Sequence, residues 1–234
     1  MLLKSNVLRM KFLYYPLAVL FLCLNMACDT TQPQPKVDIE PEKENRIEAT
    51  TKPVTQRPTI WHNPKMLTQR LGDLSDKTVA NIGAGPYGYF SIEIADEAKK
   101  VIAIDIDPKA IHFIDSMRKQ LLPLTIQDNL ETRLVVPDNP KLRFEEVDVV
   151  TIRETYAYLP NRIAYLKTLR RGIKDGGKLL IVDFKMRKLP EGPPQSEKVP
   201  LFQVERDLEE AGYRVAFVDD LSLAYQYIVI AVKE

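Results

Sequence analysis

From residue 60 onward, short apolar runs alternate with amphipathic stretches, and this alternation constrains the fold more than any other feature. Strand-like runs separated by helix-like stretches predict parallel βαβ units, because parallel strands need a long crossover connection. Right-handed crossovers then place helices on both faces of one sheet. The expected fold class is α/β, with a doubly wound and mostly parallel sheet.

Seven apolar runs are expected to form strands, and a hydrophobic content of 45% in 234 residues is sufficient to fill one large core. The expected strands are residues 78–82, 101–106, 132–136, 147–152, 178–184, 214–218 and 225–232. The expected helices run from near Tyr87 to Lys99, from Pro108 onward, over 160–173 and over 201–211. Only residues 219–224 separate the last two strands, which is too short for a helix. We therefore expect a C-terminal antiparallel hairpin.

The N-terminal segment has the pattern of a targeting sequence. Three basic residues, Lys4, Arg9 and Lys11, precede or begin the apolar segment 12–24, whose length is typical of a signal peptide and short for a membrane span. Ala27 and Cys28 follow, and they resemble the lipobox of bacterial lipoproteins. This resemblance implies a signal peptide over residues 1–28, lipidation of Cys28 and a lipid-anchored protein in the cell envelope facing the periplasm. The alternatives are ordinary secretion, an uncleaved anchor, or a cytoplasmic protein whose leader is not used.

Residues 29–58 change abruptly to Thr, Gln, Pro, Lys and Glu. Such a segment has too little apolar surface to offset the entropy lost on ordering, so it is predicted to be a disordered tether. A coil of this length reaches roughly 30 Å. The folded domain is expected to occupy residues 59–234.

The charge and the rare residues exclude several classes of function. The 33 basic and 32 acidic residues give a net charge of +1, so no nucleic-acid partner is expected, and membrane contact is expected only through the anchor. The two cysteines, Cys23 and Cys28, both precede the predicted tether, and the two histidines, His62 and His112, are far apart in sequence. A metal-centred mechanism is therefore not expected.

The stretch VANIGAGPYGYF begins as an apolar strand and then becomes glycine-rich. Gly83, Gly85 and Gly88 fit the spacing G-x-G-x-x-G, and Asp105 follows 22 residues after the first glycine, at the end of the next strand. In an open α/β sheet, ligands bind at the carboxyl ends of the strands, where bare backbone permits close approach. A carboxylate there can accept hydrogen bonds from ribose hydroxyls. The pattern predicts a nucleoside-cofactor site, with a purely structural bend as the alternative.

Three features disfavour a dinucleotide. Pro86 removes one N–H from the turn, no second domain is present to bring a substrate, and the final hairpin does not suit the dinucleotide architecture. From residue 60 to the C-terminus the sequence resembles the class I S-adenosylmethionine-dependent methyltransferases. VANIGAGPYGYFSIEIA is similar to the first motif of that family, VIAIDID to the second, VDVVTIRETYAYL to the fourth-strand motif and RRGIKDGGKLLIVDF to the region of the fifth strand. KLPEGPPQSEKV and LAYQYIVIAV resemble a small-molecule, quinone-methylating type of subgroup.

The resemblance implies a Rossmann-like methyltransferase fold with S-adenosylmethionine as cofactor. The implied cofactor-binding residues are Asn81, Gly83, Ala84, Gly85, Gly88, Asp105 and Ile106. Among these, the glycine turn would lie under the methionine part, Asp105 would hold the ribose and Ile106 would cover the adenine. Asn81 stands where the family usually has an acid. Glu154 and Tyr156 would face the methyl group as catalytic residues, and Tyr158 and Lys198 are further candidate bases.

Methyl transfer requires mainly the alignment of nucleophile, methyl group and sulfur in a dry pocket. The expected function is an S-adenosylmethionine-dependent methyltransferase acting on an unidentified small molecule or envelope component. One alternative is a non-catalytic lipoprotein that keeps the fold and binds a nucleoside or a partner protein, and another is an NAD-type oxidoreductase. The segment 185–200 is interpreted either as a lid over the site or as a passive connection.

Overall fold

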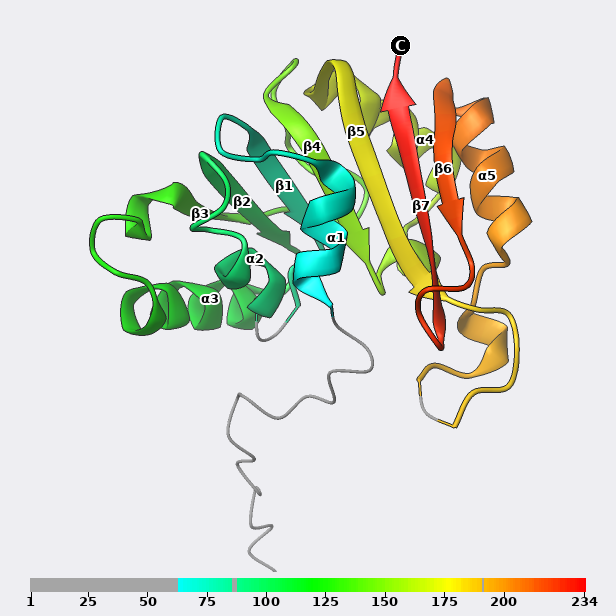
Figure 1. Cartoon of the computed structure of the whole chain (residues 1–234), viewed down its shortest axis with the longest axis horizontal. Coiled ribbons are helices and arrows are strands. Elements are labelled where there is room, and N and C mark those ends of the chain that lie inside the picture. Colours follow the sequence, from blue (N-terminus) through cyan, green and yellow to red (C-terminus); the bar gives the residue numbers. More distant parts are fainter. Residues whose placement is uncertain (1–62, 86–87, 191) are drawn as a thin grey trace, which may run out of the picture. The chain divides into compact units, whose positions relative to one another are not determined.

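The computed structural model of the chain describes residues 63–85, 88–190 and 192–234 (Figure 1). The predicted leader with Cys28, the tether, His62, Pro86 and the helix start at Tyr87 lie outside the described residues. Within the described ranges, no helix is both long and apolar enough to cross a membrane.

The described residues contain one seven-stranded mixed sheet, as the sequence predicts. The strands are β1 (Thr78–Ile82), β2 (Lys100–Asp105), β3 (Leu130–Leu134), β4 (Val147–Arg153), β5 (Ile173–Phe184), β6 (Tyr213–Asp219) and β7 (Gln226–Lys233). Their order in the sheet is β3-β2-β1-β4-β5-β7-β6. Strands β1 to β5 are parallel to one another, whereas β7 runs antiparallel to both β5 and β6.

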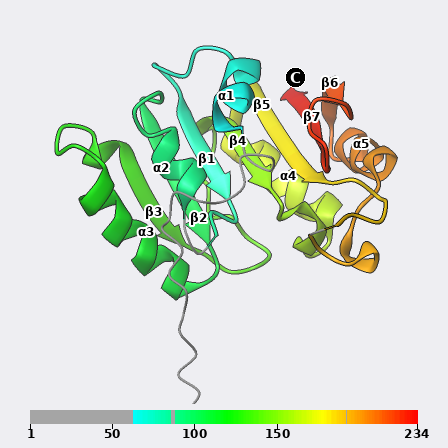
Figure 2. The ribbon, with the colours of Figure 1, turned by 60° about the horizontal axis from the view of Figure 1, so that its bottom comes forward.

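Strand β1 lies at the centre of this order and pairs with β2 on one side and β4 on the other. Its side chains alternate between the two faces: Val79 packs in one core cluster, while Ala80 and Ile82 pack in the other. The chain goes from β1 to β2 and β3 and then crosses back to β4, so the topological switch point lies between β1 and β4. The carboxyl ends of these two strands are therefore the expected ligand position. Figure 2 turns this edge of the sheet forward.

Helices cover both faces of the sheet. They are α1 (Pro64–Leu71), α2 (Tyr89–Glu93), α3 (Pro108–Leu121), α4 (Arg162–Gly172) and α5 (Leu201–Glu210). One core cluster joins α1, α2 and α3 to the sheet through residues such as Leu67, Phe90 and Ile114. The other joins α4 and α5 to the opposite face through Leu166 and Leu208. This is the doubly wound arrangement that the alternating pattern predicts.

The helix starts follow from local residues. Asn63 accepts a hydrogen bond from the Met66 N–H and is followed by proline, and Asp107 accepts one from Lys109 ahead of Pro108. The helix expected to end at Lys99 is shorter in the structure, where it corresponds to α2 and ends at Glu93. The chain then continues in turns and is directed toward β2 by the hydrogen bond from the Lys99 N–H to the Leu74 carbonyl.

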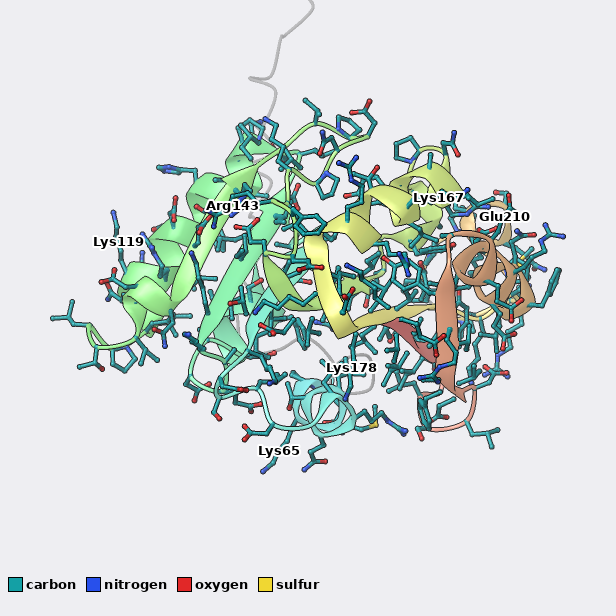
Figure 3. All side chains as sticks on the ribbon, turned by 90° about the horizontal axis from the view of Figure 1, so that it is seen from above. Lys65, Lys119, Arg143, Lys167, Lys178 and Glu210 are labelled. Atoms are coloured by element: carbon teal, nitrogen blue, oxygen red, sulfur yellow. The ribbon has the colours of Figure 1, made fainter. Side chains whose placement is uncertain are left out.

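A long side chain also fastens α1 to the sheet. Lys178 of β5 donates from Nζ to the Leu71 carbonyl, the last of α1, at 2.7 Å. Figure 3 shows Lys178 beside α1, whereas Lys65 and Lys119 project outward from their helices. A cation at this helix terminus is favourable because the last carbonyls of a helix have no partner within it.

Candidate functional site

The turn after β1 requires glycine for two different reasons. Gly83 has φ +66°, and a Cβ atom there would lie 2.3 Å from Oγ1 of Thr155, so no side chain fits. Gly85 has φ +77°, and among the described residues the nearest atom to its Cβ position is the Gly83 carbonyl oxygen, 3.9 Å away. The described part of the chain therefore leaves the backbone at Gly85 open, while the backbone at Gly83 is closed by the chain that follows β4. Gly85 is therefore the position at which a ligand can approach the main chain.

Asp105 lies directly beside this turn. Its Oδ2 accepts a hydrogen bond from the Gly85 N–H at 2.8 Å, and its Oδ1 accepts one from the Asp107 N–H at 2.9 Å. The residue is 9% exposed. The carboxyl end of β2 and the glycine turn thus form one structure, in which the carboxylate is held in a fixed orientation.

The apolar neighbours of this carboxylate differ in exposure. Ile106, next in sequence, is 56% exposed, which is unusual for a large apolar side chain beside a buried strand. Ala84 is partly buried, and its N–H donates to the Ile104 carbonyl at 3.0 Å. The turn is therefore tied to β2 by both main-chain and side-chain bonds.

Gly88 has a packing role that its place in the glycine pattern does not reveal. It precedes α2 with φ +56°, and a Cβ atom there would lie 2.4 Å from Cγ1 of Ile114 in α3. The absence of a side chain lets α2 and α3 approach closely, which matches the helix-packing use of a third glycine in such turns.

Asn81, implied as a cofactor-binding residue, is directed inward in the structure. Its Nδ2 donates to Ser91 Oγ at 2.9 Å, and its Oδ1 accepts from Thr151 Oγ1 at 2.9 Å. The residue is 2% exposed. These bonds join β1 to α2 and β4, so both ends of the amide are used inside the protein.

Glu154 lies just after β4 in the left-handed region, with φ 52°. Its N–H donates to the Val182 carbonyl at 2.8 Å, and its Oε1 accepts from Gln226 Nε2 at 2.9 Å. Gln226 is buried at the start of β7. A non-glycine residue in this conformation costs free energy, and these two bonds hold it there.

Tyr156, expected to face the methyl group, lies in the hydrophobic core. Its ring is 0% exposed, and its hydroxyl donates to Asp207 Oδ2 at 2.9 Å. Asp207 also accepts from Arg162 Nε at 3.0 Å. Burial, followed by the bond to Asp207, raises the pKa of Tyr156 above its ordinary range. Tyr156 is a core residue that joins the segment after β4 to α4 and α5.

Thr155 is one of two residues near the turn that the sequence did not predict. It lies over Gly83, and its Oγ1 donates to the Arg153 carbonyl at 2.8 Å. The regular alternation of a strand would place residues 154 and 156 on one side, but the left-handed turn at Glu154 breaks that alternation. Only the threonine between the two chosen residues therefore reaches the glycine turn.

A second missed residue, Asp183, lies at the end of β5. Its carboxylate accepts hydrogen bonds from the N–H groups of Phe184 at 2.7 Å and Ala157 at 3.3 Å. Burial raises the pKa of Asp183 to about 6, and the negative charge of Glu154 adds to the rise. Its position one residue before the end of a parallel strand was the available sequence clue.

The remaining candidate bases are held by other contacts. Tyr158 is exposed, and its hydroxyl donates to Glu197 at 2.9 Å, while Lys198 is buried and donates from Nζ to the Arg187 carbonyl at 2.8 Å. The first bond fastens the segment between β5 and α5 to the turn after β4, and the second joins two parts of that segment to each other. In the described part of the chain, no group of three or more His, Cys, Asp or Glu side chains is placed to hold a metal ion.

Comparison with protein families matches residues 81–179 to the family described as "Methyltransferase domain". The matched region begins in β1, includes the glycine turn and Asp105, and ends in β5. The described fold is a Rossmann-like methyltransferase fold. No curated relative matches the sequence significantly.

Solved structures with this fold include proteins with different stated activities. One is a SAM-dependent methyltransferase from Aquifex aeolicus, with TM-score 0.68 and 24% identity, covering 76% of this chain and 94% of that chain. Another is a geranyl diphosphate C-methyltransferase from Streptomyces coelicolor A3(2), in complex with S-adenosyl-L-homocysteine, with TM-score 0.61, 14% identity and coverages of 73% and 77%. The [4+2]-cyclase SpnF matches with TM-score 0.62, 13% identity and coverages of 73% and 79%. The fold expectation is confirmed, and the family match supports S-adenosylmethionine as cofactor.

Proposed function

We propose that this protein is an S-adenosylmethionine-dependent methyltransferase that transfers a methyl group to a small molecule or an envelope component. The observation that carries the proposal is the bond between Asp105 and the Gly85 N–H at the switch point of the sheet, beside open backbone. The methyltransferase-domain match over residues 81–179 supports the same assignment.

The residues present fit an adenosine group. Each oxygen of Asp105 accepts one backbone N–H, and a carboxylate has about four lone-pair sites, so acceptor capacity remains for ribose hydroxyls. Ile106 supplies exposed apolar surface next to it for a base. Asn81 differs from this pair, because its amide is bonded inside the protein, with Nδ2 donating to Ser91 and Oδ1 accepting from Thr151.

S-adenosylmethionine supplies a methyl group that is already activated on a sulfonium. The chain's own residues therefore bind, orient and, where the nucleophile carries a proton, accept that proton. Glu154 is the side chain we assign to proton acceptance, since Gln226 holds its carboxylate at the end of β4. Thr155 closes the turn over Gly83, and Asp183 orients the segment after β4 through the Ala157 N–H.

A non-catalytic role is the second candidate, and a specific observation favours it. Of the two side chains expected to face the methyl group, Tyr156 is buried and bonded to Asp207. The cyclase SpnF has the same fold, so the fold alone does not decide the reaction. In this alternative the protein binds a nucleoside or a partner protein without turnover.

We also propose the location that the N-terminal sequence suggests. The protein would be anchored through a lipid on Cys28 and face the periplasm, with membrane contact through the anchor only. Its partner would be a small-molecule acceptor, and a net charge of +1 gives no reason to propose a nucleic acid.

Mass spectrometry and calorimetry of the purified full-length chain test the proposal. We expect S-adenosylmethionine or S-adenosylhomocysteine to be released on denaturation, and calorimetric titration to show binding of both, with NAD⁺ as the negative control. No binding at millimolar S-adenosylmethionine would exclude the assignment. Binding without transfer of a labelled methyl group to any component of a cell extract would favour the non-catalytic alternative.

A further inference from the structure

A cavity of about 530 Å³ lies between the segment that follows β5 and the turn that joins β6 to β7. Figure 1 shows these two segments side by side at the lower end of β5. The lining residues that matter for binding are Lys185, Met186, Arg187, Leu201, Leu223 and Tyr227.

The cavity is at the same edge of the sheet as the glycine turn. β5 is two strands from β1, which corresponds to roughly 10 Å along the edge. Gln226, which bonds to Glu154, immediately precedes Tyr227 of the cavity wall. A molecule that fills the cavity could therefore extend toward the end of β4.

The walls of the cavity are held in place by hydrogen bonds. The Lys185 N–H donates to the Tyr225 carbonyl at 2.9 Å, and Arg187 Nη2 donates to the Ala224 carbonyl at 2.6 Å. The Tyr227 hydroxyl donates to the Val199 carbonyl at 2.9 Å. These bonds fix the positions of the walls, and ordered walls reduce the entropy cost of binding.

The lining combines apolar surface with two cationic side chains, Lys185 and Arg187, and one carboxylate, Asp220. Leu223 and Tyr227 are buried, while Met186 and Leu221 are exposed at the opening, with Leu221 at 92%. Lys185 is paired with Asp220, whose Oδ1 is 3.4 Å from Nζ. Arg187 forms no ion pair with any carboxylate in the described part of the chain. Its guanidinium therefore has donors available for an anion.

We propose that this cavity binds a small amphipathic molecule with an apolar body and an anionic group, and that Arg187 binds the anionic group. This inference rests on the proposed function in one respect, because it identifies that molecule with the methyl acceptor. An acceptor whose acid group binds Arg187 must extend from the end of β5 to the end of the neighbouring strand β4 for its nucleophile to reach Glu154, and adjacent strands lie about 5 Å apart.

The first test uses the fluorescent probe 1-anilinonaphthalene-8-sulfonate, an aromatic body with a sulfonate, titrated against the full-length protein. We expect saturable binding that Arg187→Glu weakens at least fivefold. Lys188→Glu is the matched control, because it changes the same charge at the next position, which does not line the cavity. Equal weakening by both variants, or by neither, would overturn the proposal. Arg187→Lys keeps the charge and is expected to bind within threefold of wild type, even if Arg187→Glu does not fold.

The second test asks which head group the cavity prefers. The competitors 3-phenylpropionate, 3-phenylpropanol and 3-phenylpropylamine have the same body with a negative, neutral or positive end. We expect the acid to displace the probe at a concentration at least fivefold below those of the alcohol and the amine. Displacement by the amine at an equal or lower concentration would contradict an anion site.

Separate measurements test the cavity proposal and the proposed function, so one can be refuted without the other. Calorimetric titration with S-adenosylmethionine is expected to give the same affinity for wild type and Arg187→Glu. Protein that binds this cofactor but shows no Arg187-dependent probe binding would overturn the cavity proposal alone. Protein that shows Arg187-dependent probe binding but no cofactor binding would leave the anion site standing and overturn the acceptor role together with the proposed function.

Discussion

The carboxylate of Asp105 accepts a 2.8 Å hydrogen bond from the backbone N–H of Gly85, across the two strands that form the proposed nucleoside site. Hydrogen bonds to a charged group contribute about 1.5–3 kcal/mol. We therefore expect Asp105→Ala to weaken S-adenosylmethionine binding by roughly tenfold to over a hundredfold in a calorimetric titration.

Asp107, two residues after Asp105, provides the control. Its carboxylate caps α3 by accepting the Lys109 N–H at 2.9 Å, so alanine would remove a helix cap and cost about 1 kcal/mol of stability. Asp107→Asn keeps an acceptor at the cap and is expected to bind the cofactor within twofold of wild type. Equal losses from Asp105→Ala and Asp107→Asn would contradict the ribose role of Asp105.

Gly85 and Gly88 are expected to separate binding from stability. Gly88→Ala places a Cβ atom 2.4 Å from Ile114 at positive φ, so we expect a loss of about 2–4 kcal/mol in the free energy of unfolding. Gly85→Ala meets no atom of the described residues closer than 3.9 Å and is expected to cost only about 1–2 kcal/mol, from the positive φ, while weakening cofactor binding. Urea denaturation and calorimetry measure the two effects, and the opposite pattern would refute this division of roles.

Tyr156→Phe is expected to affect stability rather than turnover. It removes one hydrogen bond from the buried Asp207 carboxylate, which should cost about 1–3 kcal/mol in urea denaturation. Tyr158→Phe is the matched control, because its hydroxyl bonds to Glu197 at the surface, and a change within about 0.5 kcal/mol is expected. A loss of cofactor binding in Tyr156→Phe without a loss of stability would show that the hydroxyl acts at the site.

The stability of the fold should fall as pH rises through the titration of Asp183. Burial raises its folded pKa to about 6, whereas an unfolded aspartate titrates near 3.9, so the native state binds more protons between these values. The stabilisation from the protonated carboxyl is thus fully present below the unfolded pKa. It is lost as pH rises toward 6, and it amounts to about 3 kcal/mol. The free energy of unfolding of wild type and Asp183→Asn, measured by urea denaturation at pH 4 to 7, tests this prediction. The stability of wild type should fall across this range by the amount given, and the variant should lack this contribution to the pH dependence.

Cys28→Ser tests the proposed anchor. If Cys28 is lipidated, as its position after Ala27 and the apolar leader suggests, the variant should move from the membrane to the soluble fraction. Cys23→Ser, within the apolar segment, is the control and should leave the distribution unchanged. Retention of Cys28→Ser in membranes at the wild-type level would contradict lipidation at this residue.

The seven strands could be predicted from the sequence because each is a short apolar run bounded by polar or turn residues. The hairpin followed from chain length alone, since residues 219–224 cannot form a crossover helix. The sequence also predicted that Asp105 lies next to the glycine turn, because both lie at the carboxyl ends of neighbouring parallel strands.

The rest of the site depends on contacts that local patterns do not encode. The resemblance to the methyltransferase family implied Tyr156 as a site residue, whereas the tertiary fold buries its ring and bonds its hydroxyl to Asp207. Asp183 and Gln226 enter the site through bonds to Ala157 and Glu154, which are 26 and 72 positions away in sequence. Their partners are fixed by the tertiary fold.

The position of β7 between β5 and β6 has a consequence for how the chain assembles. β6 precedes β7 in the chain, so β6 is synthesised before the strand that occupies the edge of β5, and pairing of β6 with that edge would compete with the native order. Burial selects the native order, because the residues of β7 are almost all buried whereas most of β6 is exposed or half-exposed. The more apolar strand, β7, therefore takes the inner position in the sheet. The native order requires β6 to pair with β7 at the edge and not with β5.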